Sequence, residues 1–268
     1  MTASAGHFTR LRVTRDDAVL RITLSRPEVR NAFDDVLVAE LTTSFHDAAA
    51  DKMARVVVLA GEGPVFCAGA DVAWMRRAGG YSRSENEADA EKMARMLRSI
   101  DVCPHPVIAL VQGAAIGGGV GLLAAADIAI AAEGAVFSLA EVKLGILPSV
   151  ISPYVLRAVG PRIARNLFLT GDRFDAGEAY RIGLVHEVVP ASELETAYGK
   201  KVKSLLSSGP EAMSAAKRLI EQVVSLNPED AILLTSRVIA ERRASAEAKE
   251  GLSAFLEKRS PSWAKKPE

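Results

Sequence analysis

The chain has 268 residues, of which 49% are hydrophobic and 25% are charged, and this is the composition of a folded globular protein, not of a disordered or fibrous one. Its 33 basic and 33 acidic residues balance, so the formal net charge is zero. A protein that binds nucleic acid through many phosphate contacts usually has a basic excess, so we expect no nucleic-acid partner.

Small sets of residues exclude other classes of protein. The two cysteines, Cys67 and Cys103, cannot form a disulfide framework, and neither they nor the four histidines have metal-ligand spacing, so we expect no metal. Residues 1–10 lack the apolar segment of a signal peptide. The apolar stretch at 114–132 contains a run of glycines and Asp127, which predicts buried core and not a membrane span. We expect a cytoplasmic protein with no membrane association.

Strand and helix signals alternate from the start of the chain. Residues 20–24 alternate between apolar and polar side chains, which predicts a half-buried strand that Pro27 ends. Asp34 is the expected N-cap of a helix. The short β-branched run at 56–60 precedes a glycine-containing loop, so it predicts a buried strand.

The alternation continues through the middle of the chain. Ser84 and Glu87 have the spacing of a capping box at the start of a helix. Residues 107–111 predict a strand, 122–126 a helix and 128–131 another strand. Strands that alternate with helices predict an α/β fold whose strands are largely buried.

From about Pro210 the pattern is helical to the end of the chain, with charged faces and few strand formers. We therefore divide the chain into a core at 1–195, which carries the candidate site, and a helical region at 196–268. That region could pack on its own core or on a neighbouring subunit.

The first candidate site is the loop at 64–71, Pro-Val-Phe-Cys-Ala-Gly-Ala-Asp, between a strand and a predicted helix. Its small side chains allow a ligand to approach the backbone, and free N–H groups ahead of a helix can stabilise an oxyanion. A tight turn without a ligand explains the same residues, and is the favoured interpretation for this loop alone.

The second candidate is the glycine-rich segment at 112–121, which also lies between a strand and a predicted helix. It fails the dinucleotide fingerprint, because Leu122 stands at the third glycine position, and it lacks the Lys-Ser/Thr ending of a P-loop. Alone it indicates close backbone packing. Two such loops in one chain, both offering backbone donors, indicate a shared oxyanion hole.

The third candidate is Glu141, a carboxylate in the apolar stretch at 137–148. A desolvated carboxyl has a raised pKa and can exchange protons near neutrality. An ion pair with Lys143, or an outward-facing side chain, is the alternative interpretation.

Together these segments resemble the crotonase family, the enoyl-CoA hydratases and isomerases. The resemblance is carried by Ala-Gly-Ala-Asp at 68–71, Gly-Gly-Gly at 117–119 and the Phe-x-x-x-Glu and Leu-Gly-Ile-x-Pro elements within 137–148, and it extends from 25–32 to 255–259. It implies a spiral of strand–strand–helix units, with C-terminal helices that form a homotrimer and often a hexamer of two trimers.

The resemblance also implies roles for individual residues. The backbone N–H groups of Ala68 and Gly118 would form an oxyanion hole for the thioester carbonyl as it gains enolate charge, with Glu141 as the acid and base. One donor of such a hole is typically worth about 3–4 kcal/mol of transition-state stabilisation. The implied substrate contacts are Ala68, Gly69, Ala70, Asp71, Trp74, Gly118, Gly121 and Leu147. The implied coenzyme A contacts are Arg26, Arg30, Ala32 and Lys258. No cofactor is implied, since coenzyme A is part of the substrate.

One position departs from the family pattern. Typical hydratases hold a water molecule between two glutamates; Glu141 matches the second, but Gly121 stands at the first. The two-carboxylate arrangement therefore cannot form. An enoyl-CoA hydratase, a Δ3-Δ2-enoyl-CoA isomerase with one glutamate, and a non-catalytic acyl-CoA-binding homologue remain as alternatives.

Three further elements, at 70–75, 119–122 and 150–154, are similar to bacterial methylglutaconyl-CoA hydratase-like proteins of leucine and isoprenoid breakdown. This similarity suggests a branched or carboxylated substrate such as 3-methylglutaconyl-CoA. Arg76, Arg77 or Arg83 could bind a distal carboxylate, although arginines after a turn are more often solvated.

Overall fold

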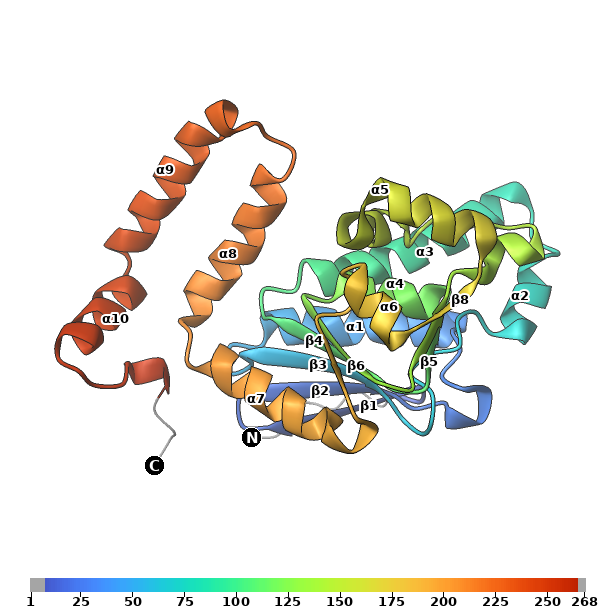
Figure 1. Ribbon diagram of the computed structural model, residues 1–268, viewed down its shortest axis with the longest axis horizontal. Helices are drawn as coiled ribbons and strands as arrows, with labels where there is room; N and C mark the ends of the chain where they lie inside the picture. The colour runs from blue at the N-terminus through green and yellow to red at the C-terminus, as the bar shows by residue number, and fades with distance from the viewer. Residues whose placement is uncertain (1–7, 265–268) are drawn as a thin grey trace.

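The computed structural model describes residues 8–264, and its elements form two sheets with helices around them (Figure 1). The larger sheet has the strand order β1-β2-β3-β4-β6-β9, with β1 antiparallel to β2 and the other pairs parallel. These strands are β1 (Leu11–Asp16), β2 (Val19–Leu24), β3 (Val56–Gly61), β4 (Val107–Val111), β6 (Ile128–Ala132) and β9 (Glu187–Val189). The smaller sheet has the order β5 (Ala114–Ile116), β7 (Val136–Ser138) and β8 (Arg173–Asp175).

Helices cover both faces of the larger sheet and continue beyond it (Figure 1). The α-helices are α1 (Asp35–Ala50), α2 (Val72–Ala78), α3 (Arg83–Asp101), α4 (Gly118–Ala125), α5 (Ser152–Thr170), α6 (Ala176–Arg181), α7 (Leu194–Leu206), α8 (Pro210–Val223), α9 (Pro228–Ala244) and α10 (Ala246–Leu256). Short 3₁₀ helices are η1 (Pro27–Val29), η2 (Ala140–Leu144), η3 (Ala191–Glu193) and η4 (Ser262–Ala264). Among the described residues, no helix has the length and apolar character needed to span a membrane.

The predicted strands at 20–24, 56–60, 107–111 and 128–131 are confirmed as β2, β3, β4 and β6. Two helix starts differ from prediction. The capping box of α3 is formed by Ser82 and Glu85, two residues before the predicted pair. Helix α4 begins at Gly118, four residues early, because Gly117 adopts a positive φ of 52° and the glycines after it are helical.

Three successive chain segments follow the same path through the two sheets. Each passes from a strand of the larger sheet to the smaller sheet and then into a helix: β3 to Cys67 to α2, β4 to β5 to α4, and β6 to β7 to η2. Cys67 forms a parallel bridge with Ala115, whose parallel partner is Phe137. Parallel segments end at the same edge, so the residues that follow them meet there. The strand–strand–helix spiral is confirmed.

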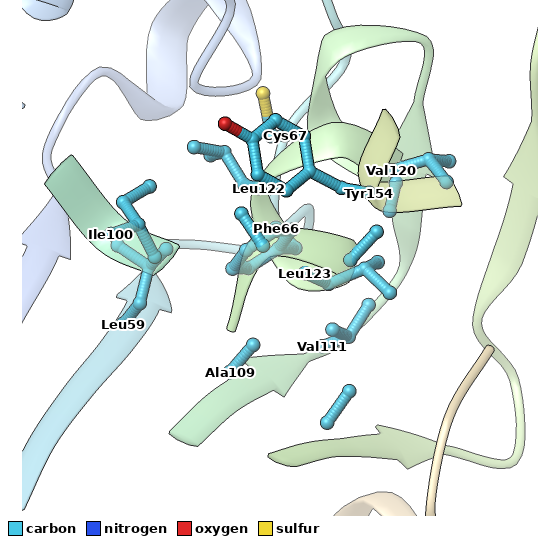
Figure 2. Packing of buried hydrophobic residues seen from close by; sticks show 14 of the residues in the cluster. Leu59, Phe66, Cys67, Ile100, Ala109, Val111, Val120, Leu122, Leu123 and Tyr154 are labelled. Carbon is cyan, nitrogen blue, oxygen red and sulfur yellow. The ribbon is translucent and has the colours of Figure 1, made fainter. Parts of the chain in front are cut away.

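The larger sheet is apolar on both faces. In β3, Val57 and Leu59 belong to the cluster that includes α1, α3, α4 and α5, whereas Val56 and Val58 belong to the cluster that includes Ala197 of α7. Figure 2 shows α4 within the first cluster, with its leucines beside the strand residues. Each fully buried aliphatic side chain contributes roughly 1.5–3 kcal/mol. The continuous apolar runs seen in the sequence are the result of this two-sided burial.

The boundary between the core and the C-terminal helices lies later than predicted. The predicted division between 195 and 196 falls inside α7, which packs on the sheet. The helices that project away are α8 to α10, which we call the C-terminal arm (Figure 1). Neither α8 nor α9 contains a buried residue. Large apolar side chains of the arm are exposed at Ile220, Val224, Ile232, Leu233, Leu252, Phe255 and Leu256.

Candidate active site

A cavity of about 360 Å³ lies where the three spiral turns end. Its walls come from the loop at 68–70, α2, α3, the start of α4, η2 and the loop at 146–151. Most of the wall is apolar. Asn86, Asp89, Glu141 and Ser149 supply polar side chains, and no Lys, Arg or His lines the cavity within the described chain.

Two backbone N–H groups are available to a ligand in this cavity. The Ala68 N–H donates to the Arg30 carbonyl at 3.0 Å, so it is not the free donor that we expected. Ala70 and Gly118 both line the cavity, and neither N–H has an acceptor within residues 8–264. Gly118 is the first residue of α4, where the N–H groups have no partner inside the helix. The free backbone donors at this cavity are therefore Ala70 and Gly118, and the expected Ala68 N–H is replaced by that of Ala70, two residues later.

A neighbouring segment holds the first of these donors in place. The Phe33 N–H donates to the Gly69 carbonyl and the Asp71 N–H donates to the Phe33 carbonyl, both at 2.7 Å. Asn31 is buried with a positive φ of 56°, and its Nδ2 donates to the Val65 carbonyl at 2.8 Å. The chain at 30–33 thus runs beside the loop and fixes the direction of its amides.

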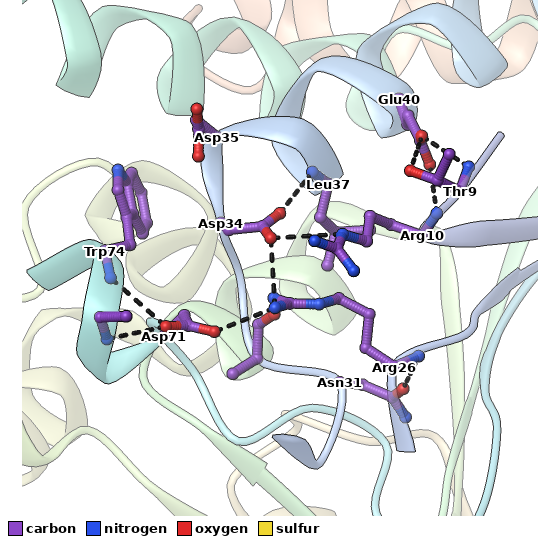
Figure 3. A network of polar contacts seen from close by, with 12 residues as sticks. Thr9, Arg10, Arg26, Asn31, Asp34, Asp35, Leu37, Glu40, Asp71 and Trp74 are labelled. Atoms are coloured by element: carbon purple, nitrogen blue, oxygen red, sulfur yellow. Dashed lines mark hydrogen bonds and ion pairs between the residues drawn. The ribbon is translucent and has the colours of Figure 1, made fainter. Parts of the chain in front are cut away.

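A buried arginine joins the caps of two helices beside this loop (Figure 3). Arg26 Nη2 lies 3.0 Å from Asp71 Oδ2 and 3.1 Å from Asp34 Oδ2. The Asp71 side chain accepts from the Ala73 N–H at the start of α2, and Asp34 accepts from the Leu37 N–H at the start of α1. One guanidinium thereby ties the starts of both helices together.

This network corrects three predicted ligand contacts. Arg26 is 6% exposed and already paired, so it does not present its charge to coenzyme A. Ala32 is buried and its carbonyl accepts from Arg26. Asp71 does not line the cavity and acts as a helix cap. None of these three residues lines the cavity, and their contacts hold the loop and the helix starts in place.

Glu141 faces the glycine that precedes α4. A Cβ atom added at Gly117 would lie 2.9 Å from Glu141 Oε1, so any side chain there would displace the carboxyl. Glu141 Oε2 is buried without a hydrogen-bond partner in the described structure, and Lys143 pairs with Asp172 instead. Burial raises the pKa of Glu141, and a hydrogen bond from its own backbone N–H only partly opposes this. The carboxyl can therefore hold a proton in the cavity.

The position of the missing glutamate is closed by another side chain. A Cβ atom added at Gly121 would lie 2.2 Å from Ile151 Cγ2. Gly121 is buried and does not line the cavity, so its expected contact with substrate is wrong. Ile151 comes from the loop before α5, thirty positions along the chain, which is why no local pattern revealed the closure.

Two apolar residues line the cavity as expected. Trp74 is 7% exposed, and its indole N–H is buried without a partner in the described part of the chain. Leu147 is 67% exposed and belongs to the loop at 146–151. Gly69 also lines the cavity beside the two oxyanion donors.

Helix α3 forms a wall of the cavity that the sequence patterns did not predict. Asn86, Asp89 and Met93 line it, and their spacing of three and four residues places them on one face of the helix. The polar residues among them have the character of a solvated helix surface, so only the apolar residues of α3 were recognised as packing positions. A search for polar residues on the apolar face of that helix would have found Asp89.

The predicted coenzyme A cations have different surroundings. Arg30 is exposed, and its carbonyl bonds to Ala68 at the cavity edge. Lys258 follows α10 in the C-terminal arm and is not part of the cavity wall.

Two of the arginines considered for a distal substrate carboxylate are paired with other residues. Arg77 pairs with Asp35 and Arg83 with Glu87. Neither arginine lines the cavity.

Comparison with known proteins agrees with this geometry. The family described as "Enoyl-CoA hydratase/isomerase" matches residues 14–266. The chain belongs to this family. A Rhodobacter capsulatus protein named "Probable enoyl-CoA hydratase" is 37% identical over 259 residues, which are 95% of this chain and 97% of that protein.

Solved structures show the same crotonase fold. A crystal structure of an enoyl-CoA hydratase from Shewanella pealeana has a TM-score of 0.93 and 40% sequence identity, over 96% of this chain and 97% of that one. Pseudomonas aeruginosa AtuE has a TM-score of 0.92 and 38% identity, over 96% of this chain and all of that one. The spiral and the C-terminal arm therefore belong to a fold shared along nearly the whole chain.

The contact between Gly121 and Ile151 predicts strong coupling between the two positions. Gly121→Ala should cost about 1–3 kcal/mol of unfolding free energy through overpacking, and Ile151→Ala about 2–5 kcal/mol through a cavity. The double variant should lose about 0.5–3 kcal/mol less unfolding free energy than the sum of the two single losses. Urea denaturation measures this cycle. Gly134→Ala, where an added Cβ meets nothing within 4 Å, is the matched control; additive effects would contradict the closure.

The raised pKa of Glu141 predicts a pH-dependent stability difference. The folded state holds this proton to a higher pH than the unfolded chain, whose pKa is near 4.5, so stability is lost as pH rises through the folded pKa. Glu141→Gln removes that loss. The variant should match wild type below pH 4.5 and become more stable than it as pH rises above that value. Denaturation over a pH series checks the direction, and a constant difference would refute it.

Proposed function

We propose that this member of the family is an enoyl-CoA hydratase, which adds water to the Cα=Cβ bond of a 2-enoyl-CoA thioester. The observation that carries this proposal is the meeting of two free amides, Ala70 and Gly118, with the unpartnered carboxyl of Glu141 in one apolar cavity. The amide N–H groups can donate hydrogen bonds to a developing oxyanion, and the carboxyl can give or take a proton. Both are required for chemistry through an enolate.

The two amides stabilise the enolate. When water attacks Cβ, the electrons of the Cα=Cβ bond move onto the thioester oxygen, which sits between the Ala70 and Gly118 N–H groups. These donors are fixed by the segment at 30–33 and by α4, so they do not have to reorient as charge develops. Each donor is worth about 3–4 kcal/mol in comparable sites.

Glu141 supplies the proton for Cα. Desolvation raises the pKa of Glu141, so its carboxyl stays protonated to a higher pH than a solvated glutamate and can act as a general acid. As the enolate collapses, Cα takes this proton and the thioester carbonyl re-forms. In the reverse reaction the carboxylate removes the same proton.

The cavity wall favours an uncharged, branched acyl group over a carboxylated one. Its side chains are mostly apolar, and its two titratable groups, Asp89 and Glu141, are both acids. A distal carboxylate as in 3-methylglutaconyl-CoA would therefore need a cation from outside this wall. Arg76 is exposed on α2 and has no ion pair in the described structure, so its recruitment is the way in which a carboxylated substrate would bind.

For coenzyme A, we propose Arg30 as the cation of this chain and Lys258 as one from a neighbouring subunit. Arg30 is exposed beside Ala68, whereas Lys258 lies in the C-terminal arm. The exposed apolar side chains of that arm favour assembly into the homotrimer, or hexamer of two trimers, implied by the family resemblance. Sedimentation equilibrium should give three or six times the 28.5 kDa chain mass; a monomer would contradict it.

A Δ3-Δ2-enoyl-CoA isomerase is the second candidate. The closure of position 121 by Ile151 leaves Glu141 without a partner on α4, and a single carboxyl can carry a proton from Cγ to Cα. The same amides would stabilise the dienolate. The reaction differs in needing no water.

The different surroundings of two arginines predict different effects. Arg26→Met should lower the unfolding free energy by about 3–5 kcal/mol, because it leaves the largely buried Asp71 carboxylate without a counter-charge and Asp34 with only Arg10. Arg30→Met should change stability by less than about 0.5 kcal/mol while weakening coenzyme A binding. Denaturation and titration calorimetry measure the pair. If Arg30→Met bound coenzyme A with unchanged affinity, Arg30 would not belong to the coenzyme A site.

A substrate panel with two enzymes tests the function. Wild type should hydrate straight and branched 2-enoyl-CoA thioesters, with loss of the conjugated enoyl absorbance, and should act more slowly on 3-methylglutaconyl-CoA. Glu141→Gln should lose about 10²–10⁴-fold in kcat with coenzyme A binding retained. Gain of conjugated absorbance from a 3-enoyl-CoA, without hydration, would establish the isomerase. No reaction with any thioester would leave a binding protein.

A further inference from the structure

With position 121 closed by Ile151, a second proton-handling group has to come from another element. Helix α3 packs against α4, and successive turns of α3 lie beside different glycines of α4. Leu97 Cδ2 lies 3.6 Å from a Cβ added at Gly121, and Met93 Cε lies 2.9 Å from one added at Gly118. The next turn of the same helix carries Asp89.

This order places Asp89 on the cavity wall, one turn of α3 beyond the residue that faces Gly118. Four residues of α-helix rise about 6 Å, so Asp89 is one turn from the methionine that touches Gly118. Glu141 comes from a different element, η2, and its Oε1 lies 2.9 Å from a Cβ added at Gly117. Both acids line the one cavity, and they are its only titratable side chains within the described chain. The cavity thus holds two carboxyls, Glu141 facing Gly117 and Asp89 one turn of α3 beyond the residue that faces Gly118.

Asp89 differs from the other acids of α3. Glu85 bonds to Ser82, Glu87 pairs with Arg83, and Glu91 pairs with Arg95. The half-buried Asp89 carboxyl has neither a hydrogen bond nor an ion pair within residues 8–264. Its neighbour on the cavity face, Asn86, is held by hydrogen bonds to two backbone carbonyls. An unpaired acid at a cavity wall is available to a water molecule.

Resting on the hydratase proposed above, we propose that Asp89 is a catalytic base that binds and deprotonates the attacking water. It takes the role that the family's first glutamate performs from position 121, but from a different helix. The serine of the lining, Ser149, cannot take this role, because a hydroxyl does not accept a proton near neutrality.

In the proposed step Asp89 starts as a carboxylate and Glu141 starts as a protonated carboxyl. Asp89 takes one proton from water as the water oxygen bonds to Cβ, and the Cα=Cβ electrons move to the thioester oxygen. The protonated Glu141 then gives its proton to Cα as the carbonyl re-forms. Afterwards Asp89 loses its proton to solvent and Glu141 gains one, so the net change is addition of one water.

The test separates water chemistry from proton transfer at Cα. Asp89→Asn should lower hydration kcat by about 10²–10⁴-fold with little change in KM, and Asp89→Glu should recover part of the rate. Exchange of the Cα protons of butyryl-CoA in D₂O needs only the oxyanion hole and Glu141. It should therefore persist in Asp89→Asn and disappear in Glu141→Gln. Glu91→Gln, on the same helix but outside the cavity, is the matched control.

Each other result is decisive. Hydration within twofold of wild type in Asp89→Asn would overturn the role of Asp89 and leave the hydratase intact. Equal loss of hydration and exchange in that variant would show that Asp89 supports the fold of the site and not the water. A wild-type protein that hydrates no enoyl-CoA would overturn the hydratase, and the role of Asp89 with it.

Discussion

The site depends on the ion pairs that one buried guanidinium makes with two helix caps. Arg26 lies between Asp34 and Asp71, and these carboxylates hold the first turns of α1 and α2. Buried charges are costly unless they are paired, so the ion pairs of Arg26 with both aspartates stabilise the starts of α1 and α2. Asp71 ends the loop at 68–71, so its bonds to Arg26 and to the start of α2 also hold the end of the loop that carries the Ala70 N–H. These holding contacts lie outside the cavity wall.

The replacement of a glutamate by glycine is a rearrangement of packing as well as a loss of charge. At position 121 the space belongs to Ile151, so the α4 side of the cavity is apolar and closed. The carboxyls that remain are on η2 and α3, which approach the same glycine pair from different directions. With the roles proposed for Glu141 and Asp89, proton transfer comes from η2 and α3 and not from α4.

The zero net charge is consistent with this design. The proposed oxyanion stabilisation comes from uncharged amides, and the proposed coenzyme A cation, Arg30, is a single exposed residue beside Ala68. Most of the other charges near the site serve structure. Arg26 is buried in its ion pairs, and Arg77 and Arg83 make exposed ion pairs outside the cavity wall.

The sequence by itself determined the α/β fold class and the three segments of the site, because hydrophobic runs, glycine loops and the apolar setting of Glu141 are local signals. The spiral followed from the resemblance of those segments to the crotonase family. Only the tertiary structure decided which groups in those segments are free. Ala68 and Ala70 have the same side chain, but only the first has its N–H bonded, to a residue 38 positions away. The closure by Ile151 and the exposure of Asp89 to the cavity likewise arise from elements packed across the chain. Long-range contacts of this kind leave no periodic pattern in a single sequence.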